Sequence, residues 1–124
     1  MNPLKQKYEA IVELIRDGRL EDFIPHIAEN SEWELHGFKT LQGKEEVVEF
    51  LRGMPWEQYT FVARHYLCAG HTLVVEGTCQ VEDDGDMIEH FYCDIYHFSP
   101  DDKVVKMSSY FVFTDPDDEE FEFE

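Results

Sequence analysis

Basic residues are scarce in this chain. Ten Lys and Arg stand against 28 Asp and Glu in 124 residues, which gives a formal net charge of −18 at pH 7. Proteins that bind phosphate backbones use clustered Lys and Arg, so we expect no nucleic acid as a partner. The same repulsion argues against an anionic membrane surface. Many of the acids crowd into residues 115–124, which we interpret as an acidic tail after the folded part.

Long apolar runs and a basic opening are also missing. Without a stretch of about 18 apolar residues, the sequence predicts neither a membrane span nor a signal peptide, and we expect the protein in the cytoplasm. The three cysteines are an odd number, and their spacing fits no zinc pattern. Because Cys68, Cys79 and Cys93 lie in strand-like runs, we expect free thiols, with no disulfide and no structural zinc.

What remains is the composition of a packed protein, with 43% hydrophobic and 15% aromatic residues. A chain of this length buries about two thirds of the surface that its unfolded form exposes, so it can hold a core without metal or disulfide bonds. There is room for one domain, which we place at residues 1–114 and which the acidic tail follows.

Helical spacing dominates the first half of the chain. Apolar residues recur three and four positions apart over residues 3–16, which predicts an amphipathic helix. A second short helix is expected over residues 20–29, followed by a brief strand over residues 32–36. A third helix opens at residues 43–46 and ends before Pro55.

After Trp56 the period of the apolar residues changes from about 3.6 to 2. Four strands are expected, joined by short turns rich in Gly, Asp, Ser and Pro that favour antiparallel hairpins. Their ranges are 59–69, 72–82, 87–98 and 103–114. Long strands in a small sheet curl, and helices fill the concave side. The chain is therefore predicted to be an α+β protein whose curved antiparallel sheet wraps around about three N-terminal helices and encloses an apolar pocket.

Four short segments add a further signal through their order and spacing. They are Gly18-Arg19-Leu20-Glu21-Asp22-Phe23, Ser31-Glu32-Trp33, Gly43-Lys44-Glu45-Glu46-Val47, and Tyr92-Cys93 through Phe98 leading to Lys103-Val104-Val105. In these segments the chain resembles the SnoaL-like branch of the nuclear transport factor 2-like superfamily, from about residue 8 to residue 114. The resemblance implies a cone-shaped α+β fold.

The resemblance also implies a range of activities, because related proteins include cyclases, isomerases, dehydratases, epoxide hydrolases and members without known chemistry. Many SnoaL-like sequences end the last strand with a Glu-Tyr pair and an Asp two residues beyond the Tyr. This chain has Ser109-Tyr110-Phe111-Val112 there. Both carboxylates are absent, which weighs against a catalytic function of the chain.

Strand alternation sorts the side chains into two faces. The faces expected to turn inward are Leu73, Val75, Gly77, Cys79 and Val81 on one strand, and Tyr59, Phe61, Ala63, His65 and Leu67 on the strand before it. For the strand over 87–98 the residues leave two choices. One face has Phe91, Cys93 and Ile95, and the other has His90, Tyr92, Asp94, Tyr96 and Phe98. The family resemblance favours the second set for the pocket.

In that arrangement Asp94 lies between two tyrosines, and desolvation raises its pKa toward the range of a general acid or base. We expect Asp94 to take a proton next to a carbonyl group, while His65 or Tyr92 donates a hydrogen bond to the oxygen where charge develops. The substrate would be a small apolar, cyclic or carbonyl compound, and no cofactor is expected. The remaining ligand-binding residues are Trp33, Phe50, Met54, Phe61 and Tyr96.

These residues also have structural roles as alternatives to catalysis or binding. Asp94 is alternatively a structural carboxylate, His65 a core histidine, and Trp33 a wall of the core. A metal site would need His65, His90 and Asp94 to converge. No histidine pair has the close helical spacing that makes such a site readable, so we expect no metal.

The second class of function is a non-catalytic module that binds a ligand or dimerises. Its support is an apolar set on the last two strands: Val105, Met107, Phe111 and Phe113 beside Phe91, Cys93 and Ile95. A soluble monomer does not usually expose so large a patch. We therefore predict a homodimer through the outer face of the sheet.

Overall fold

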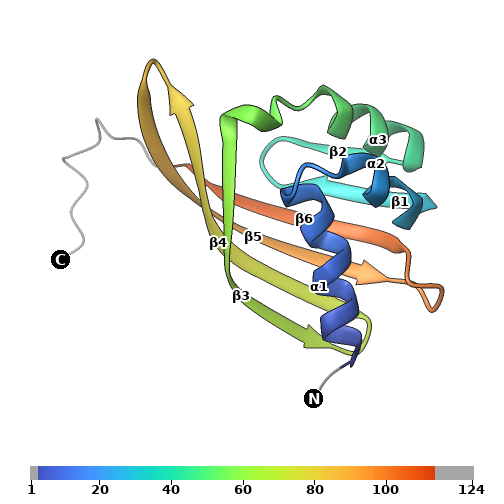
Figure 1. Ribbon diagram of the computed structural model, residues 1–124. Coiled ribbons are helices and arrows are strands. Elements are labelled where there is room, and N and C mark those ends of the chain that lie inside the picture. The colour runs from blue at the N-terminus through green and yellow to red at the C-terminus, as the bar shows by residue number, and fades with distance from the viewer. Residues whose placement is uncertain (1–2, 114–124) are drawn as a thin grey trace.

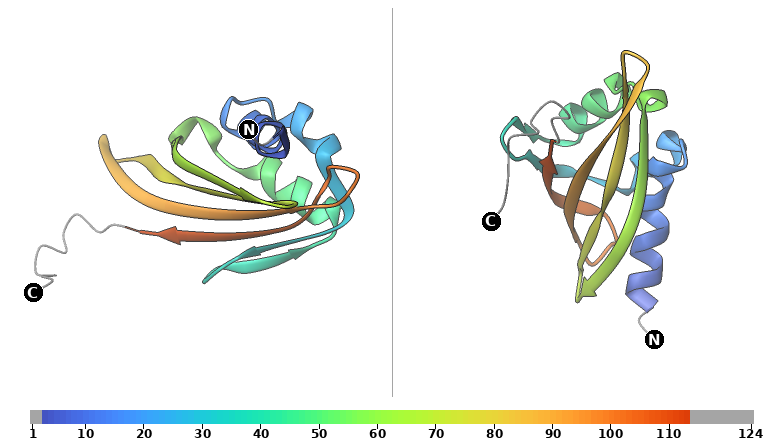
Figure 2. Two further views of the ribbon diagram at one scale, coloured as in Figure 1. Left: turned by 90° about the horizontal axis from the view of Figure 1, so that it is seen from below. Right: turned by 90° about the vertical axis from the view of Figure 1, so that its left-hand side faces the viewer.

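Three α-helices lie on one side of a curved six-stranded sheet in the computed structural model, which describes residues 3–113 (Figure 1). Figure 2 shows that this side is the concave one, so the helices fill the inside of the curve. The predicted α+β class and the wrapping of the sheet around the helices are confirmed. The acidic tail expected at residues 115–124 lies outside the described residues.

Helix α1 (Pro3–Arg16) begins and ends where the sequence predicts. Its buried stripe includes Tyr8, whose ring stacks on Phe98 of the sheet at a centroid distance of 3.8 Å. This contact holds the helix against the concave face. Helix α3 (Lys44–Gly53) also agrees with the prediction and buries Val47 and Leu51.

The expected second helix is shorter than predicted. Helix α2 (Leu20–Phe23) passes into a 3-10 turn, η1 (Ile24–His26), and strand β1 (Ile27–Leu35) starts directly after it. Pro25 explains the difference, because it has no N–H for a helical hydrogen bond and disfavours helical geometry at the residue before it. A short strand that the sequence did not predict, β2 (Lys39–Gln42), pairs with β1.

The four predicted strands are all present. After the 3-10 turn η2 (Trp56–Gln58) come β3 (Tyr59–Ala69), β4 (Thr72–Asp83), β5 (Asp86–Phe98) and β6 (Val104–Val112). Neighbours among them pair as antiparallel hairpins, as expected. The sheet as a whole has the order β2-β1-β6-β5-β4-β3 and is mixed, because β1 runs parallel to β6. The expectation of a purely antiparallel sheet is therefore wrong at this one pair.

Strand β3 contains a bulge that reverses its alternation. Its register against β4 shifts between Ala63 and His65, and Gly77 of β4 lies opposite Ala63. After this point Tyr66 is half-buried and packs against the core, while the His65 side chain is 73% exposed. The expectation that His65 and Leu67 face the pocket is therefore wrong, because one extra residue moves each later side chain to the opposite face.

The two choices for β5 are resolved by burial. Tyr92, Tyr96 and Phe98 are buried on the concave side, so the face that includes Asp94 turns inward as the resemblance favoured. On β6 the buried Met107 is the partner of Tyr96.

The apolar set assigned to the outer face of β6 needs correction. Met107 and Phe111 pack with the core, so they belong to the concave side. The outer face carries Tyr110 and Val112 instead, both exposed. None of the helices in residues 3–113 is long and apolar enough to cross a membrane.

The bulge depends on Gly77. A Cβ atom at this position would overlap the carbonyl oxygen of Val62 and lie 2.9 Å from its carbonyl carbon. Since backbone atoms in a sheet have little room to shift, Gly77→Ala should lower the free energy of unfolding by about 1–3 kcal/mol. Urea denaturation measures the change. The matched control is Gly53→Ala in α3, where a Cβ meets nothing within 4 Å. Equal stability of both variants would contradict this account of the bulge.

Candidate functional site

Asp94 is the one carboxylate that the concave row of β5 turns toward the core. The residue as a whole is half-buried, but its Oδ1 atom is buried and has no hydrogen-bond partner among the described residues. Burial raises the pKa of this carboxyl group from 3.8 to about 6, and a hydrogen bond from Ser109 on β6 acts in the opposite direction. A buried carboxylate without a full set of partners is costly, so this group needs an explanation.

Two tyrosines flank Asp94 on the same face. Burial and the negative charge of Asp94 both raise the pKa of Tyr92 and of Tyr96. Their hydroxyl groups are therefore protonated near neutral pH, and each has a proton to donate.

Aromatic rings surround this tyrosine pair. The ring of Trp33 meets Tyr96 edge-on at 6.4 Å, and the ring of Phe61 meets Tyr92 edge-on at 5.3 Å. Trp33 is only 2% exposed and donates from Nε1 to the Ser31 hydroxyl at 3.1 Å. Of the residues predicted for the site, Tyr92 and Tyr96 flank Asp94, while Phe61 and Trp33 each contact the ring of one of these two tyrosines.

Cys79 lies near Asp94 on the neighbouring strand. Burial raises the pKa of its thiol to about 11, and the charge of Asp94 adds to the effect. The thiol is therefore protonated at neutral pH and is a poor nucleophile. It acts as a small apolar residue of the concave wall.

The other predicted residues are less closely tied to Asp94. Phe50 on α3 is half-buried, and the Lys39 ammonium lies 5.3 Å from the centre of its ring. Met54 caps the C-terminal end of α3 and is also half-buried. His65 lies on the convex face, where its Nδ1 is 2.8 Å from Glu76. The structure therefore does not bring His65 together with Asp94.

A polar group that the sequence did not predict lies at the edge of the concave side. Arg16, the last residue of α1, donates to the Tyr66 hydroxyl at 3.0 Å and pairs with Glu13 at 2.9 Å. The Tyr66 hydroxyl also donates to Glu13 at 3.3 Å. Strand alternation alone placed Tyr66 on the outer face, because it does not predict the bulge. Gly77, a glycine inside the neighbouring strand, was a signal in the sequence of a close backbone approach at this point.

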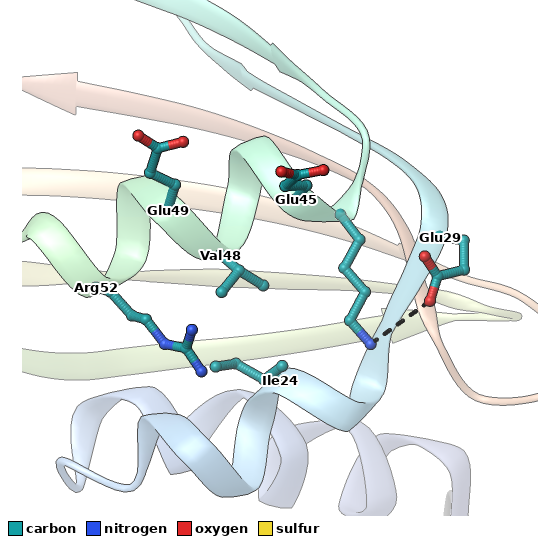
Figure 3. Close-up of a pocket in the computed structure, with 7 residues that line it drawn as sticks. Ile24, Glu29, Glu45, Val48, Glu49 and Arg52 are labelled. Carbon is teal, nitrogen blue, oxygen red and sulfur yellow. Dashed lines mark ion pairs between the residues drawn. The ribbon is translucent and has the colours of Figure 1, made fainter.

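Two surface clefts adjoin the helices. The larger, about 590 Å³, lies between α3 and the turn η1. Figure 3 shows Ile24 and Val48 on its inner side, the carboxylates of Glu45 and Glu49 directed away from it, and an ion pair of Lys44 with Glu29 at one end. The smaller, about 360 Å³, lies between the end of α1 and the start of β3. Phe61 lines the smaller cleft and contacts Tyr92, which flanks Asp94. Of the two clefts, the smaller one is therefore the one linked to Asp94 by side-chain contacts.

A metal site formed by His65, His90 and Asp94 has no support in the geometry. His65 lies on the convex face, whereas His90 and Asp94 are on the concave face of β5. Within residues 3–113 no three His, Cys, Asp or Glu side chains are grouped as a metal ion would require.

The curved sheet, the helices inside it and the polar groups on its concave face define a cone-shaped α+β domain of the nuclear transport factor 2-like class. The SnoaL-like domain family matches residues 8–107, and the chain belongs to this family. A search of the curated proteins finds no match.

Solved structures share the fold. A nuclear transport factor 2-like protein of unknown function from Cytophaga hutchinsonii is 22% identical with a TM-score of 0.80, covering 88% of this chain and 99% of that one. An LEH-like epoxide hydrolase of M. tuberculosis is 15% identical with a TM-score of 0.70, covering 87% and 81%. SalBIII, an epoxide hydrolase/cyclase-like enzyme described in pyran ring formation in the polyether salinomycin, is 17% identical with a TM-score of 0.70, covering 86% and 91%. At such identities the similarity shows the fold alone.

The raised pKa of Asp94 predicts a pH dependence of stability. Between pH 3.8 and about 6 the folded state holds more protons than the unfolded state, so the free energy of unfolding falls as the pH rises through this window. The loss should be roughly 3 kcal/mol. The Asp94→Asn variant has no carboxyl group to ionise at this position and should not lose this stability. The difference in unfolding free energy between the variant and the original protein should therefore increase by roughly 3 kcal/mol, in favour of the variant, between about pH 4 and pH 7.

Urea denaturation at several pH values measures this difference. Asp102→Asn is the control, because a hydrogen bond from Lys7 lowers the pKa of Asp102 and the slope should have the opposite sign, at lower pH. A difference for Asp94→Asn that does not change with pH would contradict the assignment.

Proposed function

We propose that the concave face of the sheet binds a small, largely apolar ring compound beside Asp94 and that Asp94 transfers a proton next to its carbonyl group. One observation carries the proposal: a carboxylate oxygen, Asp94 Oδ1, is buried on an aromatic-lined face and has no hydrogen-bond partner within residues 3–113. A ligand that supplies a proton or a donor to this oxygen would relieve the cost of its burial. Two of the solved structures with this fold are described as an epoxide hydrolase and an epoxide hydrolase/cyclase-like enzyme, which supports an enzymatic reading.

The pKa of Asp94 suits the task. With a pKa of about 6 the carboxyl group is mostly ionised at pH 7, yet it is a stronger base than an exposed aspartate. It would remove a proton from the carbon next to a carbonyl group, which leaves an enolate. The protonated hydroxyl of Tyr92 would donate a hydrogen bond to the enolate oxygen. Return of the proton from Asp94 to another carbon would complete an isomerisation.

The direct test is hydrogen exchange at a ketone. When 2-tetralone is incubated with the protein in D2O, NMR should show loss of the protons next to the carbonyl faster than in buffer alone. Asp94→Asn should slow the catalysed exchange by about 100-fold or more, since general bases contribute about 10²–10⁴-fold. In the original protein the rate should rise with pH through about 6, where Asp94 ionises.

Two further variants sharpen this test. Tyr92→Phe should slow the exchange less than Asp94→Asn does, because it removes one hydrogen bond to the developing oxyanion. His65→Ala is the matched control, because His65 lies on the convex face and its loss should leave the rate unchanged. Exchange at the same rate with the original protein and Asp94→Asn would remove the catalytic proposal. Binding of the ketone without any exchange would favour the alternative, a ligand-binding module without catalysis.

We also propose that the protein forms a homodimer through the convex face of the sheet. An uncharged and mostly apolar row crosses this face on four paired strands, with Val62 opposite Thr78, Thr78 opposite Phe91, and Phe91 opposite Val112. Val62, Phe91 and Val112 are exposed, and the helices lie on the other side of the sheet (Figure 2). A second copy of the same row would cover it. In a chain of net charge −18, a row without acidic residues is where two copies meet with least repulsion.

Light scattering coupled to size-exclusion chromatography tests the dimer. The mass should be twice the 14.7 kDa of one chain, and Phe91→Arg should reduce it to a single chain. Phe38→Arg, at the exposed turn between β1 and β2, is the control and should leave the mass unchanged. A single-chain mass for the original protein at tens of micromolar would overturn this proposal.

A further inference from the structure

We propose that the smaller cleft, between the end of α1 and the start of β3, is the entrance to the Asp94 site, and that it selects ring compounds with a second, uncharged oxygen that accepts a hydrogen bond from Arg16. The inference rests on the proposed function, because it assigns a ligand class to the same concave site. It adds a specificity residue, Arg16, and a charge requirement that the chemistry at Asp94 does not impose.

The cleft has the size and the walls of a small-molecule site. Its volume of about 360 Å³ is within the roughly 300–1,000 Å³ typical of ligand pockets. Three aromatic side chains line it: Trp56, Tyr59 and Phe61. The ring centres of Trp56 and Phe61 are 6.2 Å apart, and those of Tyr59 and Phe61 are 6.1 Å apart at an angle of 21°. Flat apolar walls of this kind favour a ring as the occupant.

Two side chains in contact lie between the cleft and Asp94. Phe61 lines the cleft and meets Tyr92 edge-on at 5.3 Å, and Tyr92 stands two residues before Asp94 on the same face of β5. Phe61 is half-buried, so its ring is partly free of the core packing. A ring compound that replaces Phe61 against Tyr92 would bring its reacting end to Asp94 while its other end remains in the cleft.

Arg16 provides the polar contact at the outer end. Its guanidinium group is held in place by Tyr66 at 3.0 Å and by Glu13 at 2.9 Å. A guanidinium group has five N–H donors, and these two contacts leave donors for a ligand oxygen. Arg16 is part of the lining of the cleft. It also lowers the pKa of Tyr92, whereas burial and the charge of Asp94 raise it, so both charges act on this hydroxyl group.

The charges around Arg16 favour a neutral ligand. Glu13 already balances the guanidinium charge, and Glu57 adds a negative charge to the lining of the same cleft. The whole chain carries a net charge of −18. A carboxylate or phosphate on the ligand would therefore meet net repulsion, while a ketone, ether or lactone oxygen would accept a hydrogen bond without that cost.

Three ketones with the same ring test the inference: 2-tetralone, 6-methoxy-2-tetralone with an added neutral acceptor, and 6-carboxy-2-tetralone with an added anion. Quenching of the Trp56 fluorescence measures binding, with Trp56→Phe to assign the signal. The methoxy compound should bind about tenfold more tightly than 2-tetralone, the value of one hydrogen bond to a charged group. The carboxy compound should bind most weakly.

Variants assign the preference to Arg16. Arg16→Met should make the methoxy compound and 2-tetralone bind equally. Glu13→Gln should improve binding of the carboxy compound by up to about fivefold, since the charge of Arg16 is then no longer balanced. A merely structural role of the pair would not shift binding toward the anion. Arg52→Met is the matched control, because Arg52 pairs with Glu21 and lines the larger cleft.

The outcomes separate the two proposals. If the three ketones bind equally and Arg16→Met changes none of their affinities, the inference is overturned. The proposed function would still stand in that case if proton exchange depends on Asp94. If no ketone binds and none exchanges protons, both the inference and the proposed function fail.

Discussion

The close approach of β4 to β3 at Gly77 is the constraint on which the concave side depends. Because a side chain at Gly77 would overlap the backbone of Val62, only glycine allows the two strands to meet there, and β3 accommodates the meeting with a bulge. Past the bulge, Tyr66 faces α1 and reaches Arg16 and Glu13, while His65 faces the convex side and reaches Glu76. One inserted residue thus decides which titratable side chains of β3 face the concave side.

The concave side combines apolar walls with few ionisable groups. Asp94 lies between the buried Tyr92 and Tyr96, and burial raises the pKa of its carboxyl group to about 6. The same low polarity keeps the hydroxyl group of Tyr92 protonated. Burial therefore raises the pKa of the carboxyl group and the pKa of the neighbouring hydroxyl group together.

Much of the fold could be predicted from the sequence because the signals for helices and strands are local. Periods of 3.6 and 2 located α1, α3 and the four long strands, and the inward face of β5 followed from the family resemblance. The errors arose where a single residue or a partner distant in the sequence determines the local structure. Pro25 ended the second helix early, the bulge reversed the positions of His65 and Tyr66, and the parallel pairing of β1 has no signature in its own sequence. Arg16 was missed because its partner Tyr66 lies on a strand 50 positions away in the sequence.

The pairing of β1 with β6 has a consequence for how the chain folds. One partner of β1 is β2, a strand of four residues, and the other is the last strand of the sheet, which ends at Val112. During synthesis on a ribosome, the helices and β1 emerge first but lack the surface on which they pack. Folding is then expected to proceed from the later hairpins toward the amino terminus, with a slow closing step set by the long separation of these two strands.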